Sequence, residues 1–247
     1  MTKKFKVAVL GATALGCGIA YEGGENVVLI DEGADLAADY TRTLRPMRPV
    51  SPGNIVANEL IRRGLVGRGV STPALDAIMC GLLRDSGAGM LLCCRPAAIE
   101  REDHGYRVGY FGTNGFGSVL CDRVVDTRAL SGEKRYNLIC ARIEGDEELF
   151  CEGFEAFPGG FDAEGFLSVK LPQYVESPLT EVLSRFENRS ATLPSGWKIA
   201  AAAHETDVRG KPGISESRDG ILRIQSAAYD NADAAFEEGR KCFTAVF

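Results

Sequence analysis

Val7-Ala-Val-Leu10, Gly11-Ala-Thr-Ala-Leu-Gly16 and Val27-Val-Leu-Ile30-Asp31 are the segments that decide how the rest of this chain is interpreted. The four apolar residues 7–10 predict a short buried strand, and the glycine-bearing turn predicts a tight passage into a helix. The apolar run 27–30 predicts a second buried strand that ends in an acid. This strand–turn–helix–strand order is typical of a dinucleotide-binding βαβ unit.

In such a unit each position of the turn has a physical role. The first glycine allows the turn, small residues let the backbone approach a pyrophosphate, and the last glycine lets the helix lie close to the strand. The helix N-terminus favours the phosphate charge, and an acid about 20 residues further on accepts hydrogen bonds from ribose. Thr13 departs from this pattern, because a second glycine belongs there. The predicted cofactor contacts are Gly11, Ala12, Thr13, Ala14, Leu15, Gly16 and Asp31, with Glu32 as the substitute acid.

The N-terminus also allows an export interpretation. Lys3, Lys4 and Lys6 precede an apolar stretch as in a signal peptide, and residues 14–17 loosely suggest a lipoprotein cleavage site. The leucine is one position too close to the cysteine, however, and glycines interrupt the apolar run at turn-like spacing. A signal peptide would not require a second strand and an acid at the observed interval. We therefore expect a cytoplasmic protein.

Composition limits the possible partners. The 247 residues are 45% hydrophobic and 25% charged, which is normal for a soluble globular protein, and no run approaches a membrane span. The net charge of −6 disfavours nucleic acid. Eight cysteines without a C-x-x-C pair suit reduced, buried thiols, and two histidines make a multi-histidine metal site improbable. We expect a small-molecule substrate, no nucleic acid, no membrane, no bound metal and a possible homo-oligomer.

The region after Asp31 is rich in loops. One or two helical turns fit residues 34–40, and Arg42, Arg45 and Arg48 then follow among prolines. These arginines could meet a diphosphate or an acidic substrate, or they could lie in a solvated loop. Helices are predicted over 54–64 and 71–85, and a buried strand over 90–94.

From residue 97 the hydrophobic pattern changes to a period of two, which is typical of strands. Strands are predicted over 97–101, 106–111 and 118–123, with turns at 103–105 and 113–115, and Asn114-Gly115 is a strong hairpin signal. Another apolar strand is predicted over 124–127.

This order of elements resembles the flavin-binding half of FAD-dependent oxidoreductases of the two-dinucleotide-binding-fold type, in which a β-meander follows the third strand. The resemblance implies an α/β fold with a Rossmann-like FAD/NAD(P)-binding domain, a parallel sheet and a β-meander. It also implies FAD as the cofactor. Arg128 stands where the family has a glycine after the threonine. The further cofactor contacts that the resemblance implies are Ala98, Asp126, Thr127 and Asn231. Asn231 ends the segment 225–231, the start of a last helix that the resemblance directs toward the pyrophosphate.

The remaining residues complete two predicted domains. Residues 1–130 and 196–247 would form the FAD/NAD(P)-binding domain, and 131–195 a small antiparallel β plus helix insert on the substrate side. Within the insert, strands are predicted over 135–143, 148–157 and 166–171. A helix over 177–188 is predicted to begin with a capping box of Ser177 and Glu181. Residues 197–203 are expected to return to the main sheet, 204–218 to form a loop, and 226–247 to form the closing helix.

The sequence is compatible with three functions. The first is an FAD-dependent oxidoreductase of unknown small-molecule substrate, with His204 as the candidate catalytic residue and Asp207 as a weaker one. The second is a non-catalytic nucleotide-binding or partner-binding protein with a reduced flavoprotein-like fold, which Thr13, Arg128 and the small insert favour. The third is a short-chain dehydrogenase, which is disfavoured because no tyrosine is followed by a lysine four residues later.

Overall fold

The computed structural model describes residues 4–128, 131–188, 190–211, 213–217 and 219–246, so Lys3, Leu130 and Phe247 lie outside the described residues. The chain divides into two compact units. The first contains Met1–Asp39, Asp76–Leu130 and Lys211–Phe247, and the second contains Tyr40–Leu75 and Ser131–Gly210. Residues 40–75 and 196–210 thus group with 131–195. The division of roles between an FAD-binding and a substrate-side domain stays a prediction.

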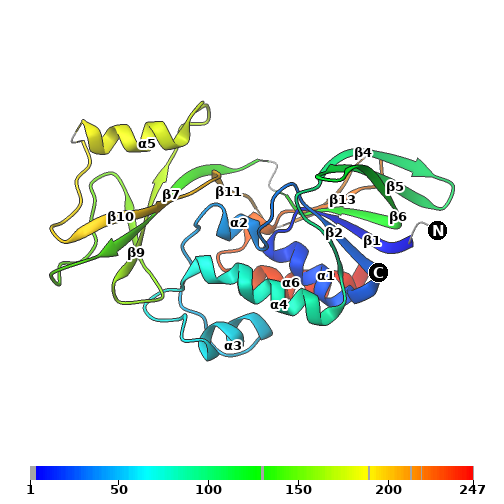
Figure 1. Ribbon diagram of the computed structural model, residues 1–247, viewed down its shortest axis with the longest axis horizontal. Helices are drawn as coiled ribbons and strands as arrows, with labels where there is room; N and C mark the ends of the chain where they lie inside the picture. The colour runs from blue at the N-terminus through cyan, green and yellow to red at the C-terminus, as the bar shows by residue number, and fades with distance from the viewer. Residues whose placement is uncertain (1–3, 129–130, 189, 212, 218, 247) are drawn as a thin grey trace. The chain divides into compact units, whose positions relative to one another are not determined.

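The first unit contains a mostly parallel sheet with the strand order β12-β13-β6-β1-β2-β3, and β4 and β5 continue from β6 as a meander. Helices α1, α4 and α6 cover one face of this sheet, and the meander lies on its other side (Figure 1). The elements are β1 (Lys4–Leu10), α1 (Ala14–Gly23), η1 (Gly24–Asn26), β2 (Val27–Ile30), α4 (Leu75–Ser86), β3 (Gly89–Leu91), β4 (Arg95–Glu102), β5 (Gly105–Gly112), β6 (Gly115–Asp126), β12 (Ile214–Glu216), β13 (Leu222–Ile224), η3 (Ser226–Ala228) and α6 (Ala232–Val246). The four-residue helix α2 (Ala38–Thr41) lies at the boundary of the two units.

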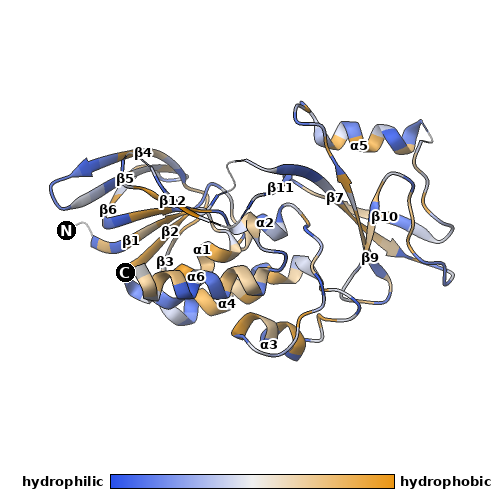
Figure 2. Ribbon diagram, turned by 180° about the vertical axis from the view of Figure 1, so that it is seen from behind, coloured by the Kyte–Doolittle hydropathy of each residue, from blue (hydrophilic) through white to orange (hydrophobic). Residues whose placement is uncertain are grey.

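The predicted βαβ unit is confirmed. Strands β1 and β2 pair in parallel with Val7 opposite Val27, and all four residues of β2 are buried. Burial on both faces explains why each strand is an uninterrupted apolar run, which Figure 2 shows in orange. One face packs under α1, and the other packs against the meander through Phe5, Ala8, Tyr106 and Val108.

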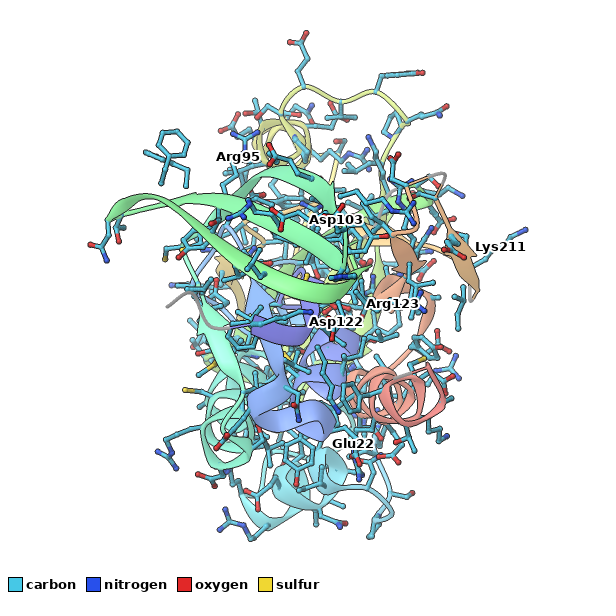
Figure 3. All side chains as sticks on the ribbon, turned by 90° about the vertical axis from the view of Figure 1, so that its right-hand side faces the viewer. Glu22, Arg95, Asp103, Asp122, Arg123 and Lys211 are labelled. Atoms are coloured by element: carbon cyan, nitrogen blue, oxygen red, sulfur yellow. The ribbon has the colours of Figure 1, made fainter. Side chains whose placement is uncertain are left out.

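The meander is also confirmed, with one correction. Residues 118–123 and 124–127 were predicted as separate strands, but β6 is one continuous strand from Gly115 to Asp126. The sequence has no turn-forming residue around Arg123 and Val124, so the chain does not turn there. The strand pairs antiparallel with β5 and then continues in parallel with β1. The meander carries charged side chains toward solvent, among them Arg95, Asp122 and Arg123 (Figure 3).

The second unit is built on an antiparallel sheet with the order β10-β7-β9-β8, and β11 also pairs with β7. A hydrophobic core that includes Tyr136, Phe166 and Val182 lies between this sheet and helix α5. The elements of this unit are α3 (Ile55–Arg62), η2 (Thr72–Ala74), β7 (Glu133–Arg142), β8 (Glu155–Pro158), β9 (Glu164–Lys170), α5 (Pro178–Glu187), β10 (Trp197–Ala202) and β11 (Asp207–Arg209).

Three local predictions for this part of the chain need correction. Residues 197–203 do not join the main sheet, because Trp197 pairs with Arg142 of β7. The strand predicted over 148–157 is only β8, from Glu155 to Pro158. The capping box at Ser177 does not form, because the Ser177 hydroxyl lies 2.8 Å from that of Thr180 and Glu181 pairs with Arg185. The cap of α3 is confirmed, since Asn54 Oδ1 accepts a hydrogen bond from the Ala57 N–H at 2.9 Å.

Helices α1 and α6 are in close backbone contact at Gly18. A Cβ atom on Gly18 would lie 2.0 Å from the carbonyl oxygen of Phe236, so Gly18→Ala is expected to lower the free energy of unfolding by about 1–3 kcal/mol through overpacking. The matched control is Gly81→Ala in α4, where a Cβ would meet nothing within 4 Å. That variant is expected to gain up to about 1 kcal/mol because alanine has the higher helix propensity. Urea denaturation followed by far-UV circular dichroism measures both; equal effects would contradict the proposed contact.

Candidate nucleotide site

The Gly11–Gly16 turn lies between β1 and α1, where the sequence predicts it. Gly11 has φ = +100°, a conformation that favours glycine, and Thr13 is the N-cap residue of α1. The Thr13 hydroxyl accepts a hydrogen bond from the Gly16 N–H at 3.0 Å. Thr13, at the position of the second glycine, therefore uses its own side chain to cap the N-terminus of α1.

Thr13 also ties the turn to the end of β6. Its hydroxyl donates to Thr127 Oγ1 at 2.7 Å, and the Thr127 hydroxyl contacts the carbonyl oxygen of Gly11 at 3.0 Å. Thr127 is fully buried and Thr13 nearly so. The two threonines therefore face each other inside the protein and hold β6 against the turn.

Asp31 lies where the ribose-binding acid is predicted, but its carboxylate already has two backbone partners. Oδ2 accepts from the Ala12 N–H and Oδ1 from the Gly33 N–H, each at 2.8 Å. Only 7% of the residue is exposed. In this arrangement Asp31 stabilises the turn that follows β1.

A second carboxylate occupies the N-terminus of α1. Asp39 Oδ1 accepts from the Ala14 N–H at 2.8 Å, and its Oδ2 accepts from the Ser226 hydroxyl at 2.7 Å. The Ser226 oxygen in turn accepts from the Leu15 N–H at 3.1 Å. Asp39 and Ser226 together take the two N–H groups that point out of the helix end, and a carboxylate is favoured there for the same reason as a phosphate.

The backbone N–H groups of Ala12 and of residues 14–17 each donate a hydrogen bond within the protein. Those of Ala14 and Leu15 go to Asp39 and Ser226, and those of Gly16 and Cys17 go to the side chain and the carbonyl of Thr13. The Ala12 N–H goes to Asp31. The carbonyl of Ala12 accepts from Ala38, so residues 36–38, which are buried, lie directly against the turn. Each of these donors has a partner inside the protein.

Arg128 closes the side of the turn at Gly11. A Cβ on Gly11 would lie 2.6 Å from Arg128 Cγ. The guanidinium is held by both oxygens of Asp126 at 2.9 Å, and these hydrogen bonds raise the pKa of Arg128. The arginine that replaces the expected glycine therefore covers the backbone that a pyrophosphate would approach. In the conformation described, the residues of the turn do not fit the diphosphate of FAD.

The structure places the other predicted residues as follows. Glu32 is exposed next to Asp31, and Ala98 is exposed on β4 opposite Gly109. Asn231 precedes α6, whose first residue is Ala232, so the closing helix begins later than the predicted Ser226. Asp126 and Thr127 lie beside the turn, as described above.

His204 and Asp207 belong to the second unit. The His204 side chain is exposed, and its backbone N–H donates to the carbonyl of Arg42 at 2.8 Å. Asp207 is fully buried and forms an ion pair with Arg45. Arg45 and Arg42 are themselves buried, so the solvated loop considered for this region is wrong for both. A catalytic role for His204 stays a prediction.

Asp39 is not predicted as a site residue from the sequence, and Ser226 is predicted only as part of the segment 225–231. Asp39 lies 25 residues from its partner Ala14 and 187 residues from Ser226. No local spacing rule joins such positions. The one available signal was the position of Ser226 at the start of the predicted closing helix, which the resemblance directs toward the pyrophosphate.

Other chemistry is sparse in the described part of the chain. No group of three or more histidine, cysteine, aspartate or glutamate side chains there is arranged to hold a metal ion. All eight cysteines are free thiols, six of them buried, and burial raises the pKa of the Cys17 thiol. Every helix among these residues is too short or too polar to cross a lipid bilayer.

Comparison with solved structures identifies the fold. The p-nitrophenol 4-monooxygenase PnpA from Pseudomonas putida DLL-E4 aligns with a TM-score of 0.67 at 10% identity, over 99% of this chain and 80% of that chain. Glycine oxidase from Bacillus cereus ATCC 14579 aligns with a TM-score of 0.58 at 12% identity, over 98% and 94%. Aklavinone-11 hydroxylase, solved with FAD and aklavinone, aligns with a TM-score of 0.58 at 12% identity, over 97% of this chain and 61% of its own.

Neither the family models nor the curated proteins give a match to this chain. The three solved structures named above nevertheless align with nearly all of it; they are a monooxygenase, an oxidase and a hydroxylase solved with FAD. The chain therefore has the fold of FAD-dependent oxidoreductases, with a mostly parallel sheet and a separate antiparallel sheet. The fold that the resemblance implied is confirmed.

Proposed function

We propose that this protein is a non-catalytic protein that binds a small molecule or a partner, and that it does not carry out flavin redox chemistry. It has the fold of a flavoprotein, but its own residues close the diphosphate site. The carboxylate of Asp39 at the N-terminus of α1 carries this proposal. A diphosphate there would have to displace Asp39, Ser226 and residues 36–38, and its charge would repel the carboxylates of Asp39 and Asp31. Like charges in one low-dielectric site are strongly unfavourable.

The expected result is a colourless purified protein whose absorption spectrum lacks the visible bands of a bound flavin. Excess FAD is expected to leave the melting temperature unchanged, since the N–H groups of Ala12 and of residues 14–17 already have partners inside the protein. A ligand present at 100 times its dissociation constant would add about 2.7 kcal/mol, a shift that thermal denaturation detects easily. The aklavinone-11 hydroxylase, which has the same fold and was solved with FAD, serves as the positive control. A yellow protein, or stabilisation by FAD, would overturn the proposal.

The second candidate is the FAD-dependent oxidoreductase of a small-molecule substrate. It is favoured by the length of the structural match, which includes a hydroxylase solved with FAD. This function requires that residues 36–39 leave the turn when the cofactor enters, and the same experiment decides between the two. A cytoplasmic location, a small-molecule ligand and a homo-oligomer are part of either proposal.

A further inference from the structure

The second unit contains a cavity of about 180 Å³ that has no part in the site described above. It lies beside β8 and β9, and the turn that carries Arg68 forms part of its rim. Six of the side chains that line it are Arg68, Arg142, Leu149, Phe157, Phe161 and Trp197. Three of these six are aromatic and two are guanidinium groups, so the cavity offers both flat apolar walls and positive charge.

Trp197 provides a fixed aromatic wall. The residue is 8% exposed, and its indole N–H donates to the carbonyl of Glu147 at 2.8 Å, which sets the orientation of the ring. Behind it, Gly165 of β9 allows close packing, because a Cβ there would lie 2.6 Å from Leu149 and 3.3 Å from the indole. A glycine in the middle of a strand often marks such a close approach.

Arg142 is held over this wall. It is the cross-strand partner of Trp197, and its guanidinium carbon lies 5.9 Å from the centre of the indole ring. Its Nη2 donates to the carbonyl oxygen of Asp162 at 3.3 Å. Within the described ranges, no carboxylate forms an ion pair with Arg142, so most of its donors remain available to a ligand.

The acids that line the cavity are engaged elsewhere or exposed. Glu164 accepts from the Ser71 hydroxyl at 3.2 Å and from the Gly160 N–H at 2.7 Å. Glu148 is 82% exposed and lies 3.4 Å from Arg68, a pair that water screens. Asp162 contacts Arg142 only through its backbone carbonyl. The positive charge next to the indole is therefore that of Arg142.

We propose that this cavity binds a small aromatic carboxylate. The ring packs among the aromatic side chains of the lining, Trp197, Phe157 and Phe161, and the carboxylate accepts hydrogen bonds from Arg142, which is suited to bidentate recognition of carboxylates. The volume limits the ligand to about one ring, because drug-sized molecules occupy cavities of roughly 300 Å³ or more. Binding at this cavity does not depend on whether the protein binds FAD at the Gly11–Gly16 turn.

The experiment uses the single tryptophan of the chain, Trp197, as a fluorescent reporter. Benzoate is expected to change its emission saturably, and neutral benzamide, which has nearly the same shape, is expected to bind at least about 10-fold more weakly because it lacks the charge. Arg142→Gln is expected to weaken benzoate binding by about 10-fold or more. The matched control is Arg185→Gln, because Arg185 also lies over an aromatic ring, Phe154 at 6.0 Å, but pairs with Glu181 outside the cavity.

Isothermal calorimetry gives the same affinities without relying on the reporter, and circular dichroism verifies that each variant is folded. The proposal is overturned if benzoate shows no saturable binding, if benzamide binds as well as benzoate, or if Arg185→Gln weakens binding as much as Arg142→Gln. None of these results depends on whether the protein binds FAD.

Discussion

Asp207→Ala is expected to lower the free energy of unfolding of the second unit by about 3–5 kcal/mol, the usual cost of leaving a buried charge without its partner. Arg45 Nε donates to Asp207 Oδ1 at 2.8 Å, and the Arg45 Nη2 also contacts that oxygen. The side chains are 3% and 0% exposed. The substitution removes this charged partner from a buried guanidinium, which also contacts the carbonyl of Val208 at 3.2 Å and the ring of Tyr40.

Urea denaturation followed by the fluorescence of Trp197 measures this effect, because the reporter belongs to the same unit. Arg209→Ala is the control. Arg209 also contacts Asp207, at 3.2 Å, but its side chain is 32% exposed, so its loss is expected to cost less than about 1 kcal/mol. Replacing both partners with Arg45→Met and Asp207→Leu is expected to cost less than Asp207→Ala alone. A loss below about 1 kcal/mol for Asp207→Ala would show that water reaches the pair.

Asp39→Ala is expected to have two opposite effects on the first unit. It removes the carboxylate that accepts from the Ala14 N–H and from Ser226, and hydrogen bonds to charged groups contribute about 1.5–3 kcal/mol each. The variant alone should therefore unfold at a lower temperature. It also frees the Ala14 N–H at the N-terminus of α1 and removes a negative charge there, so inorganic pyrophosphate is expected to raise the melting temperature of the variant and not that of the original protein.

Glu32→Ala is the matched control for Asp39→Ala. Glu32 is an exposed acid next to Asp31, so its loss changes the net charge equally without opening the helix end. Differential scanning fluorimetry over a pyrophosphate series, repeated at constant ionic strength, distinguishes site binding from general screening. If pyrophosphate stabilises the original protein and Asp39→Ala alike, Asp39 does not close the site.

The parts of the fold that could be predicted are those that short stretches of sequence encode. The strands 7–10 and 27–30 are continuous apolar runs, the hairpin at Asn114-Gly115 has its own turn chemistry, and Asn54 caps α3 as expected. The order of these elements was enough to predict the fold of FAD-dependent oxidoreductases, which the solved structures confirm. Each of these signals depends on neighbours within a few residues, although the equally local capping box predicted at Ser177 does not form.

Two predictions that were wrong depend on partners distant in the chain. An apolar strand over 197–202 fits either sheet, and only its pairing with β7 decides which one it joins. The arginines after residue 40 suggested an anion site or a solvated loop. Arg45 is instead neutralised inside the protein by Asp207, which lies 162 residues away. Local patterns contain no information about such pairs.

The Gly11–Gly16 turn depends both on local sequence and on residues that are distant in the chain. The sequence by itself determined that a strand, a glycine-bearing turn, a helix and a second strand ending in Asp31 would form here. Only the tertiary structure decided what fills the turn, because Asp39 and Ser226 reach it from segments that no spacing rule connects. A helix N-terminus attracts any anion, and in this fold the chain supplies its own.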